Sequence, residues 1–101
     1  MQKLRIWWIP QVPMPAFRVE VNSLVEAKLL LNALGDYDIF QYKNRVKGDY
    51  CNAGGLEVYE PDLQDWFEWS EPETGENIDS FSLAELRTRQ SFDIPLSTQL
   101  N

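Results

Sequence analysis

The sequence contains no histidine. Histidine is the commonest general base in enzymes and a frequent metal ligand, so a Ser-His-Asp or Cys-His catalytic site cannot form within one chain. Carboxylate pairs remain possible, for example among Glu57, Glu68 and Asp79, but acids at such spacings are typical of a solvated strand surface. We therefore expect a protein that is not an enzyme and that binds neither a metal ion nor a cofactor.

Cysteine and long apolar runs are also scarce. The single cysteine, Cys51, excludes an intramolecular disulfide and suits a reducing cytosol, where we expect a small, half-buried side chain. No apolar run approaches the ~20 residues that a membrane-spanning helix needs. The N-terminus lacks the apolar centre of a secretory signal. These absences predict an intracellular protein of the cytoplasm without a membrane partner.

Basic residues are missing from a long stretch in the second half of the chain. The protein has 16 acidic and 9 basic residues, and its net charge is -7. Between positions 57 and 79 no lysine or arginine interrupts the acidic residues, which are Glu57, Glu60, Asp62, Asp65, Glu68, Glu71, Glu73, Glu76 and Asp79. Because neutralising phosphates supplies most non-specific affinity for nucleic acid, this charge argues against direct nucleic-acid binding. It favours a basic partner.

Periodicity predicts two strands and a helix in the first part of the chain. Residues 4–9 are rich in β-branched and aromatic side chains, and residues 17–21 alternate between apolar and charged. Ser23 and Glu26 form a capping box, which predicts that a helix begins there. Leucines and Ala27 recur every three or four residues up to position 34, and Gly35 offers a left-handed stop. We expect this helix to span residues 23–34.

The second part of the chain predicts a hairpin and a short helix. Residues 36–42 read as a turn into a third strand or a short helical turn, with the strand slightly favoured by the aromatic content. Gly54 and Gly55 tolerate positive φ and open a hairpin with strands at 56–60 and 66–69. A polar loop covers 70–77, and a second capping box, Ser82 to Glu85, predicts a helix through about Arg89.

These elements predict one α+β domain over residues 1–90, because 101 residues suffice for a single modest core. We expect an antiparallel sheet of about five strands, with helix 23–34 packed on one face and a short C-terminal helix. We expect residues 91–101 to form a loose tail, for which Phe92, Ile94 and Leu96 are the candidate docking residues.

The four tryptophans predict that one face of the sheet needs a cover. Neighbours in a strand point to opposite faces, so Trp7 and Trp8 cannot both enter one core, and Trp66 and Phe67 are separated in the same way. Exposed rings of this number form a larger apolar patch than soluble monomers usually carry. A second copy of the chain could bury this patch in a homodimer. Alternatively, the C-terminal segment of the same chain could pack on it through Phe81, Leu83, Leu86 and Phe92.

Two sets of residues are candidate binding sites. The first is the acidic, aromatic hairpin, whose partner-binding residues would be Glu57, Tyr59, Asp65, Trp66, Glu68, Trp69 and Glu71. The second is a basic loop that could hold a nucleotide-like ligand: cations would meet phosphate, the ring would stack a base and the amide would read its edge. Its residues are Arg45, Lys47, Tyr50 and Asn52.

Four segments also resemble a group of small, mostly uncharacterised phage and prophage accessory proteins. The segments are LRIWWIPQVP at 4–13, VEAKLL at 25–30, YDIFQ at 37–41 and DYCNAGGL at 49–56. The resemblance implies a phage source and an accessory role, of which inhibition of a host defence is the commonest for small acidic proteins of this kind.

Three functional hypotheses follow from these observations. In the first, the chain is a non-enzymatic inhibitor in the host-cell cytoplasm, and its acidic hairpin occupies a basic groove of a host defence protein in place of nucleic-acid phosphates. In the second, a homo-oligomer sequesters a nucleotide-like signal. In the third, the chain is a structural or other phage accessory protein.

Overall fold

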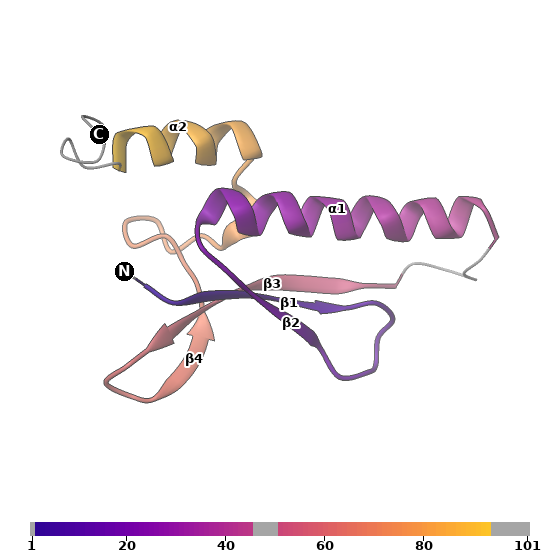
Figure 1. The fold of residues 1–101 in the computed structure, drawn as a ribbon, viewed down its shortest axis with the longest axis horizontal. Helices are drawn as coiled ribbons and strands as arrows, with labels where there is room; N and C mark the ends of the chain where they lie inside the picture. The colour runs from indigo at the N-terminus through magenta and orange to yellow at the C-terminus, as the bar shows by residue number, and fades with distance from the viewer. Residues whose placement is uncertain (1, 46–50, 94–101) are drawn as a thin grey trace.

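The structure is a computed structural model that describes residues 2–45 and 51–93. Within these ranges the chain forms four strands and two helices (Figure 1). The strands form one antiparallel sheet in the order β2-β1-β3-β4, so the sheet has four strands rather than about five. In chain order the elements are β1 (Leu4–Ile9), β2 (Phe17–Val21), α1 (Leu24–Lys43), β3 (Ala53–Glu60), β4 (Asp65–Glu68), the 3-10 turn η1 (Ile78–Ser80) and α2 (Leu83–Asp93).

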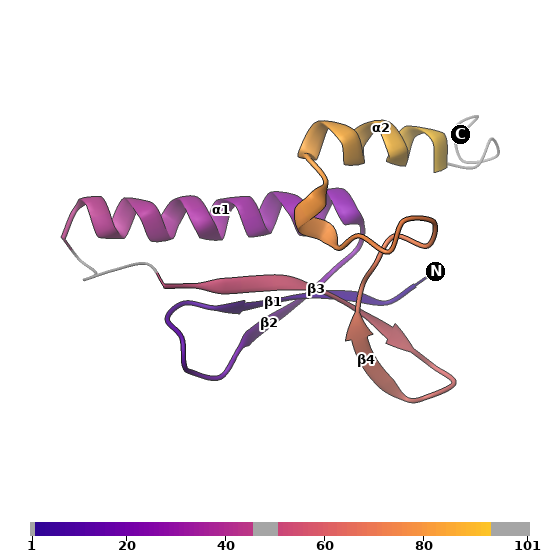
Figure 2. The same cartoon turned by 180° about the vertical axis from the view of Figure 1, so that it is seen from behind.

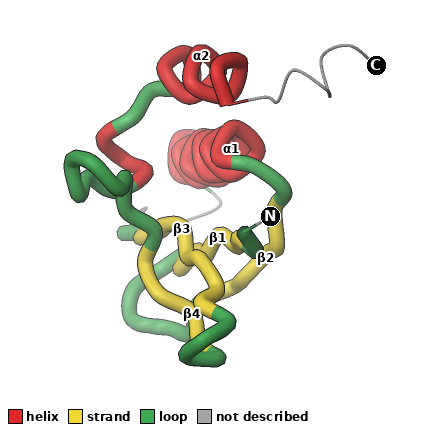
Figure 3. Tube along the Cα trace, turned by 90° about the vertical axis from the view of Figure 1, so that its left-hand side faces the viewer, coloured by secondary structure: helices red, strands yellow, loops and turns green. Residues whose placement is uncertain are grey.

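The helices and the sheet form successive layers. Figure 3 shows α1 lying on one face of the sheet and α2 lying on the far side of α1. Residues of β1 alternate, so that Leu4, Ile6 and Trp8 are buried toward α1 while Arg5 and Trp7 face the other way. The largest fully buried side chains come from the sheet, η1 and α2; they are Ile6, Leu56, Ile78 and Leu86. Helix α1 contributes Ala27, which is 0% exposed. The predicted α+β class is confirmed.

Helix α1 begins as predicted but does not end at Gly35. The Ser23 hydroxyl accepts a hydrogen bond from the Glu26 amide at 3.0 Å, and the Glu26 carboxylate accepts from the Asn22 amide at 3.3 Å. The helix then continues to Lys43, where the backbone amide of Asn44 donates to the carbonyl oxygen of Phe40 at 3.1 Å. Glycine inside a helix costs only ~1 kcal/mol.

The prediction of a strand at residues 36–42 is therefore wrong. That segment extends α1 and places Asp38 on the same helix face as Ala27, where both side chains are buried. The extended end of α1 lies above the β1–β2 connection, at the opposite end of the molecule from the β3–β4 turn (Figures 1 and 2).

Gly54 and Gly55 are not the turn that we expected but part of β3. In the pairing of β1 with β3, Gly54 lies opposite Trp8 and Gly55 lies opposite Trp7. A Cβ atom at Gly54 would come within 2.5 Å of the Trp8 ring, and one at Gly55 within 2.7 Å of the Trp7 indole nitrogen. Each ring thus covers the backbone of a glycine. Trp8 is buried and Trp7 is half-buried on the other face, which confirms that the two rings separate.

The C-terminal segment packs on the helical side of the molecule. Its capping box is confirmed, because the Ser82 amide donates to the Glu85 carboxylate at 2.9 Å and the Ser82 hydroxyl accepts from the Glu85 amide at 3.1 Å. Helix α2 then contacts α1, so the described C-terminal residues do not cover the open face of the sheet as we had considered. Helix α2 continues to Asp93, so Phe92 belongs to this helix rather than to the predicted tail. The predicted docking through Phe92, Ile94 and Leu96 stays a prediction, because the Phe92 side chain and residues 94–101 lie outside what the structure describes.

The glycine contacts lead to a paired prediction on stability. Gly54→Ala would lower the free energy of unfolding by about 1–3 kcal/mol, because the new methyl group would overlap the buried Trp8 ring and lie 3.2 Å from the Trp7 carbonyl oxygen. Gly35→Ala is the matched control. No atom lies within 4 Å of its new methyl group, and the helical backbone gains about 0.5–1 kcal/mol. Urea unfolding measures both, and equal effects of the two substitutions would contradict the role of Gly54.

Candidate functional site

The open face of the sheet brings bases from β1 and β2 next to the acidic hairpin. Across the strands, Arg5 of β1 lies between Glu20 of β2 and Glu57 of β3, and Glu57 lies opposite Glu68 of β4. The Arg5 Nε donates to the Glu57 carboxylate at 2.7 Å, and the Arg18 Nε lies 3.6 Å from the same oxygen. Glu57 is therefore neutralised by two guanidinium groups that are distant in the sequence.

The same arginine covers one of the predicted aromatic anchors. Its guanidinium carbon lies 4.0 Å from the ring centroid of Trp66, within the range of a cation–π contact. Trp66 also meets Tyr59 across the hairpin, edge to face, with centroids 5.3 Å apart. The Lys3 ammonium lies 5.7 Å from the Tyr59 centroid and 5.8 Å from the Trp66 centroid. These two rings are half-buried under cations rather than bare.

The hairpin beyond this cluster is acidic and partly apolar. Asp65 and Glu68 of β4 are exposed, and Glu60 at the end of β3 pairs directly with Asp65. Leu63 in the turn is 67% exposed and Phe67 is 43% exposed. We call this surface the acidic hairpin tip. It consists of Glu60, Asp62, Leu63, Asp65, Phe67 and Glu68.

A shallow cleft lies beside the acidic hairpin tip. Its volume is about 330 Å³, and Leu63, Phe67 and Pro72 line it together with the carboxylates of Glu60 and Glu68. The arrangement places apolar side chains between acids. Such a surface suits a partner that offers an apolar group next to basic side chains.

Two of the predicted partner-binding residues lie in the interior. Trp69 is 6% exposed, packs edge to face on Phe81 at 6.1 Å between centroids, and donates its backbone amide to the Leu56 carbonyl at 2.9 Å. Glu71 is 5% exposed. Both hold the loop after β4 against the core, and Trp69 also contributes to the lining of the cleft beside the acidic hairpin tip.

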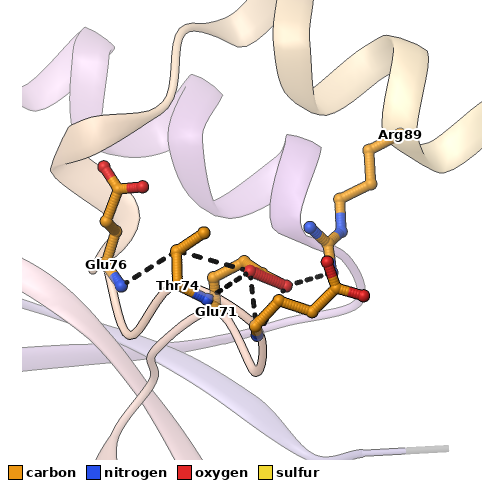
Figure 4. A network of polar contacts seen from close by, with 5 residues as sticks. Glu71, Thr74, Glu76 and Arg89 are labelled. Carbon is orange, nitrogen blue, oxygen red and sulfur yellow. Dashed lines mark hydrogen bonds and ion pairs between the residues drawn. The ribbon is translucent and has the colours of Figure 1, made fainter.

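The Glu71 carboxylate is the centre of a polar network (Figure 4). It accepts hydrogen bonds from the Glu73 amide at 3.1 Å and the Thr74 amide at 3.2 Å, and the Arg89 guanidinium of α2 lies 3.3 Å away. Burial by itself raises the pKa of this carboxyl, but the two amides and Arg89 outweigh it, so the pKa of Glu71 is lowered below its ordinary value of 4.5.

The alternative ligand-binding set lies only partly in the described part of the chain and stays a prediction. Arg45 is exposed with φ of 60°, whereas Lys47 and Tyr50 lie outside the described residues. The Asn52 side-chain amide donates to the buried Asp38 carboxylate, a pairing that sequence spacing did not reveal. Cys51 is exposed rather than half-buried.

Within residues 2–45 and 51–93, no three acidic or cysteine side chains gather in a way that could hold a metal ion. No helix in those ranges combines the length and the apolarity that a membrane crossing requires.

Comparisons with known proteins agree with the phage resemblance. The family model for superinfection exclusion gene product 17 matches residues 3–89. A superinfection exclusion protein of Salmonella phage P22 is 47% identical over 78 residues, which cover 66% of this chain and 76% of that protein. No solved structure matches. These matches support a small phage accessory protein.

The Glu71 network predicts a pH dependence of stability. A carboxyl whose pKa is lowered by folding stabilises the protein above its unfolded pKa, and this contribution is lost as the pH falls through the folded pKa. Glu71→Gln should therefore destabilise the protein at neutral pH, and the difference should shrink as the pH falls below 4.5. Thermal unfolding of the wild type and the variant at a series of pH values measures this difference in stability. Glu73→Gln, at an exposed position in the same loop, is the control, and a difference that persists in acid would contradict the network.

Proposed function

The chain belongs to the superinfection exclusion gene product 17 family, and we propose that it serves superinfection exclusion as a non-enzymatic protein that binds and inhibits a host protein. The observation that supports a binding role is the acidic hairpin tip. It stands at one end of the molecule, away from the end of α1, and carries exposed acids around Leu63 and Phe67 (Figure 1). A partner would approach this end without contacting the helices.

The partner that fits this surface is a protein with a basic groove. Charge complementarity would speed the encounter, and burial of Leu63 and Phe67 would hold the complex once formed. The cleft between Phe67 and Pro72 is large enough for one side chain of the partner. Affinity should therefore depend on salt through the acids and on packing through the two apolar residues.

We further propose that the acids replace nucleic-acid phosphates in a groove of a host defence protein in the host-cell cytoplasm. The two strands of the hairpin hold Glu60, Asp65 and Glu68 on a hydrogen-bonded ribbon, so their charge is fixed in place before binding. Glu57 contributes less to this charge, because Arg5 and Arg18 already neutralise it. Competition between the protein and a DNA duplex for the captured host protein separates this mimicry from binding at another surface.

The hairpin role is tested by charge reversal. Glu60→Lys, Asp62→Lys and Glu68→Lys together should weaken binding of the host protein at least about tenfold and abolish exclusion, because the groove would then face like charges. The measurements are capture of host proteins by the tagged chain and plaque formation by superinfecting phages on cells that express it.

The matched control moves the same charge change to other exposed acids. Asp36→Lys, Glu73→Lys and Glu76→Lys together alter the net charge equally but lie on α1 and on the loop after β4. This control should retain capture and exclusion. If both triple variants lost activity to the same extent, net charge rather than the acidic hairpin tip would be responsible.

A further inference from the structure

The outer edge of β2 is a strand edge without a neighbour among the described residues. β2 is the first strand in the sheet order, and Figure 3 shows it at the margin of the sheet. Its five residues include no proline, the residue that often blocks such edges. An unprotected edge exposes a row of backbone donors and acceptors that can pair with another strand.

The sequence of β2 is complementary to itself. Phe17, Arg18, Val19, Glu20 and Val21 form a segment in which a base and an acid flank the central valine. When two such strands pair antiparallel around Val19, Arg18 of each copy lies opposite Glu20 of the other, and Phe17 lies opposite Val21. Because the two copies are related by a two-fold axis, each of these pairs occurs twice in the dimer.

We propose that the protein forms a two-fold symmetric dimer in which the β2 edges of two copies pair antiparallel around Val19. The two sheets then continue into one another across the axis. Self-association of this kind is isologous and closes at two copies, because each β2 has one free edge. The sheet then ends on either side at β4.

The side chains that the dimer needs are weakly held within one copy. Glu20 is 3.2 Å from Lys3, but both side chains are about 60% exposed, at 62% and 59%. Arg18 is 47% exposed and lies 3.6 Å from Glu57. Exposed ion pairs of this type contribute only ~0–1 kcal/mol. Arg18 and Glu20 can therefore turn toward a second copy at little cost.

An apolar stripe on α1 lies on the same side of the molecule as the β2 edge. Its residues are spaced by three or four and are exposed; they are Leu29, Ala33, Tyr37 and Phe40. Lys28, whose ammonium lies 3.4 Å from the Ile78 carbonyl, and Asn32, which lines a cleft with Gly54, face η1 and β3. Because successive helical residues are ~100° apart, the stripe points outward and toward the β2 flank.

The proposed axis brings the two α1 helices onto the same face of the joined sheet, with these flanks toward each other. The exposed apolar side chains of this flank near the joined strands are Phe17, two residues from the axis in β2, and Leu29 in the second turn of α1. Two independent features, the charge pattern of the edge and the apolar flank above it, thus fit one symmetric arrangement. Burial of such side chains between copies would offset the entropy of association.

Charge also favours this edge over other surfaces. Each chain carries -7, so two copies repel one another, but β2 contributes one base and one acid and is locally neutral. The acidic hairpin tip includes β4, at the opposite margin of the sheet. The dimer therefore keeps the two acidic tips apart and leaves both free, so the inference does not rest on the proposed function.

Sedimentation equilibrium with charge variants tests the dimer. The wild-type chain should sediment at twice 11.8 kDa at high micromolar concentration. Arg18→Glu and Glu20→Arg alone each place like charges opposite one another and should raise the dimer dissociation constant about tenfold or more. The double variant that exchanges the two residues restores both pairs and should recover the dimer.

A mixing experiment makes the test independent of folding. The Arg18→Glu chain carries two acids at the edge and the Glu20→Arg chain two bases, so an equimolar mixture should form a heterodimer although each variant alone is monomeric. Glu73→Arg, at an exposed acid in the loop after β4, is the control and should remain dimeric. A wild-type mass of 11.8 kDa, or single variants that dimerise like the wild type, would overturn the proposal.

Discussion

The contact between two tryptophans of β1 and two glycines of β3 organises the sheet. Trp8 covers Gly54 on the face toward α1, and Trp7 covers Gly55 on the open face. Rings of this size lie flat on the neighbouring strand only where that strand has no side chains. The central pair of strands is thereby fixed in register on both faces, since a shift of one residue would place a ring against a side chain.

That register determines the electrostatics of the open face. With Trp7 opposite Gly55, Arg5 must lie opposite Glu57, and its guanidinium reaches the Trp66 ring on the next strand. The acidic run is continuous in sequence, but the sheet divides it. Glu57 is neutralised by β1 and β2, and Glu71 is held by backbone amides and α2. The unneutralised acids that remain near exposed apolar side chains belong to the hairpin tip.

The two margins of the sheet consequently differ in character. The β4 margin combines exposed acids with Leu63 and Phe67, which suits a basic partner. The β2 margin is locally neutral and complementary to itself, which suits a second copy of an acidic chain. The two proposals therefore place self-association and partner binding on separate surfaces of an elongated molecule.

Local signals in the sequence sufficed to predict the strands at 4–9 and 17–21 and both capping boxes. They also predicted the separation of Trp7 from Trp8 and the α+β class. Alternation and capping can be recognised in the sequence because they involve residues close together in the chain. Tertiary structure decided the rest. Gly35 stays helical because Asp38 is buried beyond it against Asn52, and Gly54 and Gly55 serve rings that lie about 50 residues earlier. Arg5 and Arg18 neutralise Glu57 only once three strands are side by side. Periodicity in a single chain cannot report such contacts, because they depend on which strands become neighbours and in which register.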